Sequence, residues 1–488
     1  MLDLKIIPNT SNSSDFHIFF CEKNFSFNPE KLAFTNINYK EINSILFKNK
    51  NEDYFVFNYH STRPKKIIFI NQNEYKNNFE NQNIGGKVIN EIKSAKEINV
   101  IFSKENKSLE NFYFNFFLGS FLKKYSFNKY KTIFKKNENI NEKINLLIST
   151  KNKNFFSKIK NDIDNIVNGV FLTRDLVSEP PNYLNPQMFV NEIKKLSKLG
   201  LKVEVFDHSK MKKIGMNALL GVAQGSKNLP YFVTIKWKPT NSKNKKPLSF
   251  IGKGVCFDTG GISLKPAKFM EDMKYDMAGA GAVVGLMKTL ALRKSKSYVI
   301  GTVALVENMP GGSAQRPGDI VKSYSGKTIE VLNTDAEGRL ILADAIYYID
   351  EQYNPEFIID LATLTGAIVV SLGNEYAGLF SNDDKLSEKL INAGEIENEK
   401  LWRFPLHKNY DKLMDSKIAD IQNINYSGGA GSITAAQFLQ RFLKNKTPWA
   451  HLDIAGMAWT KKDLDIIPTG ATGFGVKLLN KLVEKYYE

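Results

Sequence analysis

Short apolar segments alternate with longer segments of helical spacing through much of the chain, and most clearly after residue 160. Apolar runs of this length are typical of buried strands, whereas apolar positions three or four residues apart are typical of helices. The pattern predicts strands at 203–206, 231–237, 248–257, 298–306, 357–361 and 451–454, and helices at 163–177, 278–291 and 340–348. Strands and helices in this order indicate an α/β fold with a mixed, mostly parallel sheet flanked by helices.

The first part of the chain differs in composition and is rich in Asn, Lys and Phe. Apolar runs at 67–70 and 98–102 predict strands of a small α/β domain, and the aromatics of 112–121 predict a core face. The helix at 163–177 must end near Pro180 and Pro181, because two prolines cannot continue it. We therefore expect a small N-terminal α/β domain (1–155), a linker helix (156–180) and a larger C-terminal domain (181–488).

Composition narrows the class of protein. A hydrophobic content of 42% with 24% charged residues is that of a soluble globular protein. The longest apolar run, 357–373, contains Asp360, so we expect a buried strand plus a turn and no membrane span. The chain start lacks the layout of a signal peptide. Only two cysteines occur, which indicates a reducing cytoplasm and no disulfide framework.

The chain is basic, with a net charge of +16 and a pI near 9.3. Such a charge permits nucleic-acid binding. The lysines are scattered, however, and no arginine-rich stripe or nucleic-acid motif occurs. We therefore favour a lysine- and asparagine-biased surface over a nucleic-acid site.

Residues 333–340, with the sequence NTDAEGRL, join a predicted strand at 328–332 to the helix at 340–348. Asp335, Glu337 and Arg339 thus lie at i, i+2 and i+4 beyond the end of a strand, where open α/β sheets place their chemistry. A structural alternative exists, because Thr334 and Glu337 have the spacing of a helix capping box.

A second charged cluster follows the strand at 248–257. Lys253 interrupts this apolar run, and a buried ammonium is costly unless it is paired or neutralised. Asp258 and Asp276 have structural readings as a turn residue and a helix cap, but these leave Lys253 unexplained. Asp258, Asp276 and Lys253 together with 335 and 337 form an oxygen-rich set that suits a pair of divalent metal ions. The whole chain has only five histidines, so oxygen ligands are the more available kind. Beside two dications, the Lys253 amine would lose its proton and coordinate through nitrogen.

These residues resemble those of the leucyl (cytosol) aminopeptidases. The stretch 333–340 is similar to the family's signature octapeptide at every position, and the spacing from Lys253 through Lys265 to Arg339 also matches. The resemblance covers about 174–475. Its other motifs are 174–177, 179–182, 307–310, 316–319, 362–366 and 449–456.

The resemblance implies a metal-dependent aminopeptidase that releases N-terminal amino acids, leucine and other apolar residues favoured, in cytoplasmic peptide turnover. A hydroxide bridging two divalent metal ions would be the nucleophile. Mn²⁺ or Zn²⁺ are the implied ions, and Mg²⁺ and Co²⁺ accept the same ligands. Asp258 and Glu337 would bridge the ions. The implied ligands are Lys253, Asp258, Asp276, Asp335 (also through its backbone carbonyl) and Glu337.

The resemblance also implies roles around the metals. Lys265 would polarise the scissile carbonyl as an electrophile, and Arg339 would hold a bicarbonate that acts as general base. Backbone groups of Ala336, Gly338 and Leu364 would complete this anion site. The pocket for the first side chain would be lined by Met273, Thr363, Gly366, Ala455 and Ala458. Ala458 stands where some members of the family carry methionine.

Family members assemble as hexamers, so a homohexamer is expected, with the variable N-terminal domain serving assembly. Two alternatives stay open. One is a two-metal hydrolase of another class, such as a phosphoesterase, which would normally use histidine ligands and would lack the two lysines in this register. The other is DNA binding, which some members of the family also show.

Three further features favour structural roles. The stretch 279–285 resembles a dinucleotide loop but has one residue too many and follows no strand, so close helix packing is the better account. Cys256 lies in an apolar segment without a nearby histidine and is expected to be a buried residue rather than a nucleophile. His451, close to Trp449, is expected to be structural.

Overall fold

The computed structural model describes residues 2–7, 14–35, 38–60, 64–72, 76–92, 95–132 and 144–488. The chain forms two compact units. The first comprises Met1–Val167 with Lys462–Pro468, and the second comprises Asn168–Lys461 with Thr469–Glu488. A long helix, α5 (Lys153–Ser178), begins in the first unit and ends in the second. It ends at Ser178, two residues before Pro180, as the two prolines predict.

In the described part of the first unit, one sheet has the strand order β1-β6-β5-β2-β4-β3. All neighbouring pairs are parallel except β3 and β4. The strands are β1 (Leu2–Ile7), β2 (Phe16–Cys21), β3 (Tyr54–His60), β4 (Pro64–Asn71), β5 (Glu97–Phe102) and β6 (Ile144–Ser149). The helices are α1 (Tyr39–Lys48), α2 (Asn78–Asn90) and α3 (Glu110–Lys123). The strands expected at 67–70 and 98–102 are confirmed.

Aromatic side chains of α3 form part of the core of this unit. Phe112, Tyr113, Phe116 and Phe117 are buried and pack edge-on around Phe20 of β2, at centroid distances of 5.0 to 6.1 Å. This confirms the core face predicted from the aromatics of 112–121.

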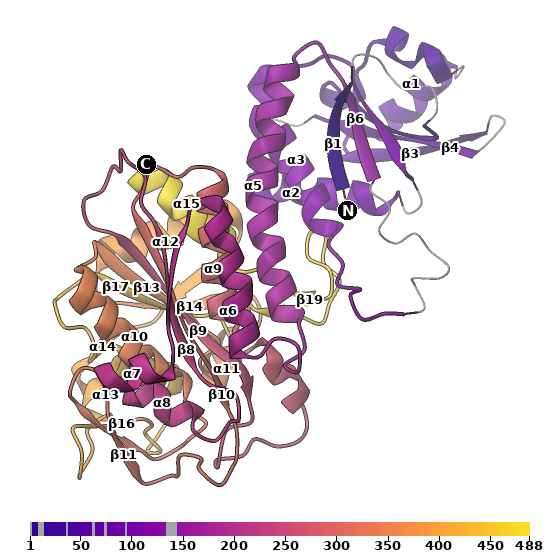
Figure 1. Ribbon diagram of the computed structural model, residues 1–488. Coiled ribbons are helices and arrows are strands. Elements are labelled where there is room, and N and C mark those ends of the chain that lie inside the picture. The colour runs from indigo at the N-terminus through magenta and orange to yellow at the C-terminus, as the bar shows by residue number, and fades with distance from the viewer. Residues whose placement is uncertain are drawn as a thin grey trace. The chain divides into compact units, whose positions relative to one another are not determined.

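The second unit is built on an eight-stranded sheet of order β15-β14-β17-β13-β9-β10-β8-β7 (Figure 1). The four central strands, from β17 to β10, are parallel. The pairs of β10 with β8 and of β8 with β7 are antiparallel, and at the other edge β14 is antiparallel to β17 and parallel to β15. The mixed, mostly parallel sheet expected from the sequence is confirmed. The strands are β7 (Lys202–Phe206), β8 (Tyr231–Trp237), β9 (Leu248–Asp258), β10 (Val299–Asn308), β13 (Phe357–Ala362), β14 (Ala377–Ser381), β15 (Leu401–Arg403) and β17 (Trp449–Asp453).

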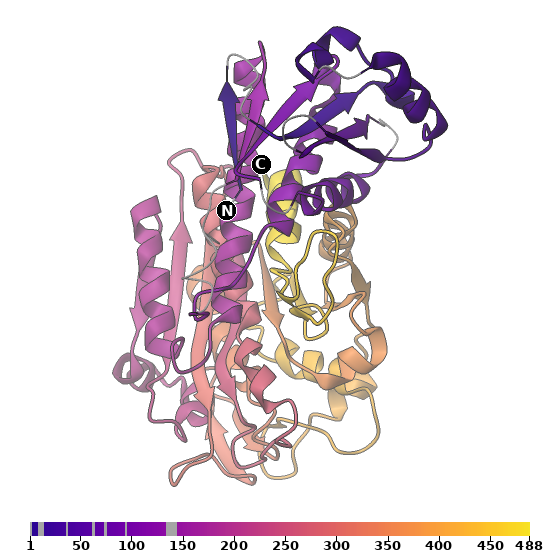
Figure 2. The same ribbon diagram turned by 90° about the vertical axis from the view of Figure 1, so that its right-hand side faces the viewer.

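Helices cover both faces of this sheet (Figures 1 and 2). Two hydrophobic clusters, one for each face, explain why the central strands are apolar throughout. One cluster joins the sheet to the end of α5 and to α6 (Pro186–Lys194), α9 (Ala278–Leu292), α12 (Asp384–Glu397) and α15 (Val476–Tyr487). The other joins it to α7 (His208–Ile214), α8 (Asn217–Ala223), α10 (Gly338–Tyr353), α11 (Gly366–Leu372) and α14 (Gly431–Gln440). The short α13 (Lys408–Lys412) and a hairpin of β18 (Trp459–Thr460) and β19 (Gly470–Ala471) complete the unit.

Two expectations about local structure need correction. The run 357–373 is not a strand plus a turn, because α11 follows β13, and the Thr365 hydroxyl caps this helix by accepting from the Ile368 amide at 3.2 Å. The strand before NTDAEGRL exists as β12 (Thr328–Val331), but it lies outside the main sheet. It pairs with β11 (Asp319–Lys322) and β16 (Ile421–Gln422) in a separate three-stranded sheet.

Among the described residues, no helix is both long enough and apolar enough to cross a lipid bilayer.

Candidate metal centre and active site

The site lies at the edge of the main sheet where its four central strands end. Asp258 is the last residue of β9, Asn308 of β10, Ala362 of β13 and Asp453 of β17. Because these strands are parallel neighbours, their carboxyl ends meet at one edge. The loop after β12, from the small sheet, brings in 333–337.

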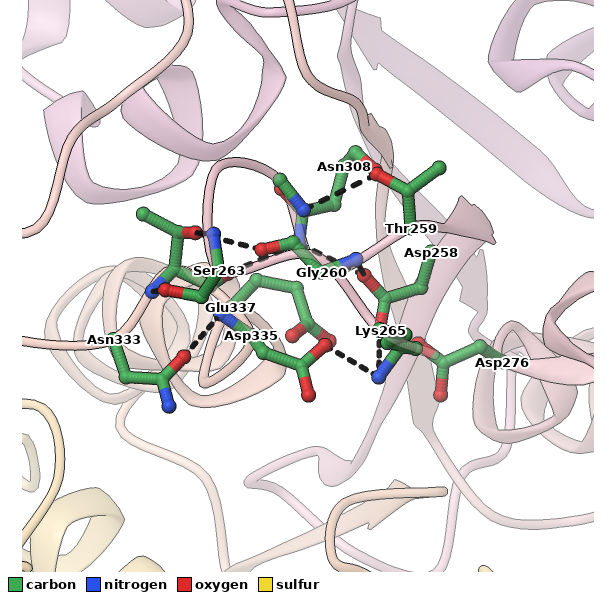
Figure 3. A network of polar contacts seen from close by, with 12 residues as sticks. Asp258, Thr259, Gly260, Ser263, Lys265, Asp276, Asn308, Asn333, Asp335 and Glu337 are labelled. Atoms are coloured by element: carbon green, nitrogen blue, oxygen red, sulfur yellow. Dashed lines mark hydrogen bonds and ion pairs between the residues drawn. The ribbon is translucent and has the colours of Figure 1, made fainter. Parts of the chain in front are cut away.

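Four carboxylates and two lysines form two adjacent ion-pair groups at this edge. Figure 3 shows Lys265 with its partners Asp258 and Asp335. The Lys253 ammonium lies 2.8 Å from Asp276 and 2.8 Å from Glu337. The Lys265 ammonium lies 2.9 Å from Asp258 and also pairs with Asp335. One oxygen each of Asp258, Asp335 and Glu337 lies within 4.8 Å of the others. The structure thus brings together the five residues that the sequence suggested as metal ligands. Lys265, which was not suggested as a ligand, lies beside them.

The electrostatics of this cluster follow from burial and charge. Burial lowers the pKa of the Lys253 ammonium, but the surrounding carboxylates, led by Asp276, outweigh burial and raise this pKa above its ordinary value. The pKa of Lys265 is raised in the same way, chiefly by Asp258. Burial raises the pKa of Asp276 well above its ordinary value, although the neighbouring Lys253 ammonium opposes this. Burial also acts on Glu337, but the two lysines outweigh it and lower the pKa of this carboxyl.

The donor set fits divalent cations. When ionised, its four carboxylates exceed the two ammonium groups by two negative charges, which leaves the cluster short of positive charge. Within the described chain, Asp276 Oδ2 is buried and has no hydrogen-bond partner. A buried oxygen of this kind is costly unless a cation or donor meets it. Carboxylate oxygens with one amine suit Mn²⁺, Mg²⁺ or Zn²⁺.

Backbone and side-chain hydrogen bonds hold Asp258 and the 333–337 loop together. The Asn308 side-chain amide donates to Asp258 Oδ1 at 2.8 Å and to the Thr334 carbonyl at 3.0 Å. The Gly260 amide also donates to Asp258 Oδ1, at 2.9 Å. Gly260 has a φ of +87°, so the turn that delivers this amide needs glycine.

The capping box that the sequence offered as an alternative is not formed. The Thr334 hydroxyl donates to the Gly260 carbonyl at 2.6 Å and accepts from the Ser263 amide at 2.8 Å. Glu337 precedes α10 without a side-chain capping bond, and its carboxylate pairs with Lys253 instead. Both side chains therefore serve the site rather than the helix end.

Gly338 lies against Lys253. A Cβ at Gly338 would lie 2.6 Å from the Lys253 Cε atom, which is closer than van der Waals contact allows. Only glycine therefore lets the start of α10 approach the lysine that pairs with Glu337.

Arg339 lies in the first turn of α10 and is buried. Its Nη1 donates to the Asn423 carbonyl at 2.7 Å, and its Nε is buried without a partner in the described chain. Burial lowers the pKa of Arg339 to about 10. A buried guanidinium with an unused donor is suited to holding a small anion.

Two of the three backbone amides suggested for the anion site already donate within the protein. The Ala336 amide donates to the Asn333 carbonyl at 3.3 Å, and the Leu364 amide donates to Asp453 Oδ1 at 3.1 Å. An anion beside Arg339 would compete with these partners.

The residues suggested for the side-chain pocket come from separate segments. Thr363, directly after β13, belongs to the metal cluster itself: its hydroxyl donates to Asp276 Oδ1 at 2.7 Å, and its carbonyl accepts from Lys253 at 2.9 Å. Gly366 begins α11 and Ala455 follows β17. Met273 is half-buried before α9. Ala458 is only 3% exposed and packs in the core on one face of the sheet.

Sequence reasoning missed two buried residues of the site, Asn423 and Asp453. Asp453 accepts from the Leu364 amide and, at 2.7 Å, from the Thr365 hydroxyl, so it holds the loop after β13. Its position at a strand end was a signal, but the strand was expected to extend to 454. Asn423 contacts both Arg339 and the loop after β12, and no local motif marks it.

The three features with expected structural roles have them. Gly279 lies inside α9, where a Cβ would come within 2.1 Å of the Leu361 carbonyl oxygen. Cys256 is buried in β9, and burial raises the pKa of its thiol. His451 Nδ1 lies 2.6 Å from Asp360 Oδ1, and Trp449 donates to the other Asp360 oxygen at 2.7 Å.

Comparison with known proteins bears on the same region. The model of the cytosol aminopeptidase family, catalytic domain, matches residues 171–480. A probable cytosol aminopeptidase of Wolbachia pipientis wMel is 54% identical over 431 residues, which cover 86% of this chain and 84% of that protein. A probable cytosol aminopeptidase of Phytoplasma australiense is 56% identical over 374 residues, covering 77% of this chain and 75% of that protein.

A solved structure gives the same picture. The bottromycin maturation enzyme BotP in complex with Mn superposes with a TM-score of 0.83 at 26% identity, covering 98% of this chain and 100% of that one. The match to the family's catalytic domain coincides with the unit that carries the carboxylate cluster. This chain therefore belongs to the cytosol aminopeptidase family and is a metal-dependent aminopeptidase, a hydrolase of the metallo-exopeptidase class.

Proposed function

We propose that this enzyme removes leucine and other apolar residues from the N-termini of peptides with the help of two divalent metal ions. This proposal rests on one observation, a cluster of four carboxylates and a lysine at the end of the central strands: Lys253, Asp258, Asp276, Asp335 and Glu337. These five side chains would hold the ions, with Asp258 and Glu337 shared between them. Mn²⁺ and Zn²⁺ are the first candidates.

When bound, the ions would lower the pKa of a water molecule and polarise the scissile carbonyl. Lys253 would take part through its neutral amine, in exchange for its present ion pairs with Asp276 and Glu337. The Thr363 hydroxyl would keep Asp276 oriented, because it donates to Oδ1 and leaves Oδ2 open.

Lys265 is suited to meet the substrate. Its side chain is 21% exposed to solvent, whereas that of Lys253 is 3% exposed. Of these two lysines, Lys265 is therefore the one that a bound peptide could contact. Its ammonium would donate to the carbonyl oxygen as negative charge develops there. Asp258 and Asp335 would hold it in place.

Arg339 would hold a bicarbonate ion that acts as general base. The Nη1 contact with the Asn423 carbonyl fixes the guanidinium, and the buried Nε has a hydrogen to donate. Backbone groups of Ala336, Gly338 and Leu364 would complete the anion site. A positioned base of this kind contributes about 10²–10⁴-fold to the rate.

One of the two ions would bind the free, neutral α-amine of a substrate. An internal peptide bond offers no such amine, so this contact would explain exopeptidase specificity. Met273, Thr363, Gly366, Ala455 and Ala458 would line the pocket for the first side chain. The small Ala458 would leave room there for a leucine side chain.

We further propose that the enzyme is a cytoplasmic homohexamer in which the N-terminal domain, 1–155, serves assembly rather than catalysis, with 156–180 as linker and 181–488 as catalytic domain. Light scattering at micromolar concentration tests the assembly. A mass of about six chains is expected, and a monomer would contradict it.

The first experiment measures hydrolysis of leucine p-nitroanilide and of its N-acetylated form by metal-stripped protein reloaded with Mn²⁺ or Zn²⁺. We expect metal-dependent release from the free-amine substrate alone. Release from both substrates would retain a metal hydrolase but remove the exopeptidase argument. If no metal restores release, the DNA-binding alternative gains weight, and steep salt dependence of DNA retention would then support it.

A further inference from the structure

Asn423 is a fully buried residue directly after β16 that joins two parts of the site from a distance in sequence. It contacts Arg339, 84 residues away, and the loop after β12, 90 residues away. A buried asparagine must satisfy both the oxygen and the nitrogen of its amide. Its partners therefore indicate what it holds in place.

Beyond the end of β12, hydrogen bonds from the side chain of Asn423 take the place of backbone pairing between strands. The backbone pairing of β12 with β16 stops at Glu330 and Gln422, and the Asn423 amide still donates to the Glu330 carbonyl at 3.0 Å. Beyond this point its Oδ1 accepts from the Leu332 amide at 2.8 Å and the Asn333 amide at 3.3 Å. Its Nδ2 donates to the Asn333 carbonyl at 2.6 Å. The side chain thus fixes the first residues of the loop that carries Asp335 and Glu337.

The backbone of Asn423 holds Arg339. Its carbonyl accepts from Nη1 at 2.7 Å, which sets the plane of the guanidinium and leaves the buried Nε without a protein partner. One residue therefore links the loop of metal ligands to the guanidinium that follows it on α10.

We propose that Asn423 is a positioning residue that acts through Arg339: its side-chain hydrogen bonds to Leu332 and Asn333 fix the place of its own backbone carbonyl, and this carbonyl holds the guanidinium in the orientation that presents Nε to the anion. This inference rests on the proposed role of Arg339. Asparagine is required because the site needs an acceptor for the amides of 332 and 333 and a donor for the carbonyls of 333 and 336 on the same side chain. Aspartate keeps the acceptor but loses the donor, and alanine loses both.

A double-mutant cycle with Asn423→Ala and Arg339→Ala in the metal-loaded enzyme tests this inference. In the wild-type background we expect Asn423→Ala to lower kcat by about 10–100-fold, with KM changed less than about threefold. The bicarbonate concentration that gives half-maximal activity should rise by about tenfold. In the Arg339→Ala background, Asn423→Ala should lower kcat by less than about twofold, because the guanidinium that Asn423 positions is already absent.

The matched control is Asn480→Ala. Asn480 is also a buried asparagine that accepts from an arginine, Arg293 Nε at 2.7 Å, but it lies on α15 and its partner precedes the amino end of β10, at the opposite edge of the sheet. The Asn480→Ala variant should have a lower thermal midpoint than the wild type, with kcat and the bicarbonate requirement unchanged. Metal content measured by mass spectrometry should equal that of the wild type in Asn423→Ala.

Several results would overturn the inference. An equal loss of kcat in both backgrounds, or loss of metal from Asn423→Ala, would make Asn423 a purely structural residue. If Arg339→Ala loses activity but Asn423→Ala keeps it, the positioning role alone is wrong. If Arg339→Ala keeps wild-type kcat, the proposed role of Arg339 is wrong as well. Should Asn423→Ala not fold, Asn423→Asp, which retains the acceptor, runs the same cycle with a smaller expected loss.

Discussion

The contrast between Lys253 and Arg339 shows how single residues divide the work of the site. The Lys253 ammonium is surrounded by carboxylates and donates hydrogen bonds to Asp276, Glu337 and the Thr363 carbonyl. Among the residues that the structure describes, the guanidinium of Arg339 has one hydrogen-bond partner, the backbone carbonyl of Asn423, and its buried Nε has none. In the proposed mechanism, Lys253 would exchange its partners for a metal ion, and Arg339 would accept an anion.

Replacing Arg339 with alanine should lower kcat by about 10²–10⁴-fold and change KM by less than about threefold, because a general base acts mainly in the transition state. Steady-state kinetics with leucine p-nitroanilide measures both constants. Arg441→Ala is the control, since this arginine pairs with Asp411 and Asp415 and contacts no residue of the site. Losses of equal size in kcat and in substrate affinity would argue against the assigned role.

Replacing Lys253 with methionine should weaken binding of one of the two ions by at least about tenfold, because a ligand is lost while the bulk of the side chain is kept. Metal content after dialysis against a graded chelator measures this. Lys236→Met, at a half-buried lysine paired with Glu204 on the far side of the sheet, should retain both ions. Unchanged affinity in Lys253→Met would remove this residue from the ligand set.

At the scale of elements, the site depends on how closely α9 and α10 approach the central strands. Gly279 allows α9 to contact the Leu361 carbonyl of β13, and Gly338 allows α10 to contact Lys253 of β9. The distance between helix and sheet therefore sets where Asp276, just before α9, and Glu337, just before α10, can reach the same lysine.

Gly279→Ala should destabilise the enzyme by about 1–3 kcal/mol, as overpacking of a close contact does. Its new Cβ would lie 2.1 Å from a backbone oxygen, which cannot rotate away. Gly312→Ala is the control, because nothing lies within 4 Å of a Cβ there. Urea unfolding of both variants gives the difference, and equal midpoints would show that α9 shifts freely.

The cysteines test the packing of two strands. Cys21 in β2 and Cys256 in β9 are buried, and burial raises the pKa of both thiols, so neither supplies a thiolate near neutral pH. We expect no alkylation by iodoacetamide at pH 8 in the native protein and modification of both thiols in guanidinium, as measured by intact mass. Rapid alkylation of the native protein would mean that one of these strands opens.

For the molecule as a whole, the cluster places an excess of negative charge inside the catalytic unit. Carboxylates held together in a buried site repel one another, and bound cations relieve this repulsion. The folded enzyme without metal is therefore expected to be less stable than the loaded enzyme.

Adding Mn²⁺ or Zn²⁺ at about 100 times its dissociation constant should stabilise the metal-free protein by about 2.7 kcal/mol per site. Differential scanning fluorimetry should show a rise of a few degrees in the thermal midpoint. Asp258→Asn should lose most of this rise, whereas Asp319→Asn, which removes a carboxylate paired with Arg316, should retain it. No rise with either metal would contradict the assignment of the cluster.

Much of the fold and the chemistry of the site follow from local sequence. Apolar runs located the central strands and α9 to within about two residues, because burial on both faces imposes an uninterrupted apolar pattern. The charges at 253, 258, 276, 335, 337 and 339 stood out since charged side chains at the ends of apolar strands need partners. The capping box at Thr334 was a wrong alternative, because tertiary partners at Gly260 and Ser263 compete for the same hydroxyl.

The sequence by itself determined which segments are strands and helices and which residue types stand at their ends, because hydrophobic periodicity and turn chemistry act between near neighbours. Only the tertiary structure decided which of those ends meet. The pairing of Lys253 with Glu337 requires that β9 and α10 pack together, and the contact of Arg339 with Asn423 requires that β12 pair with β16. Such contacts depend on strand order and crossover, which no local pattern encodes.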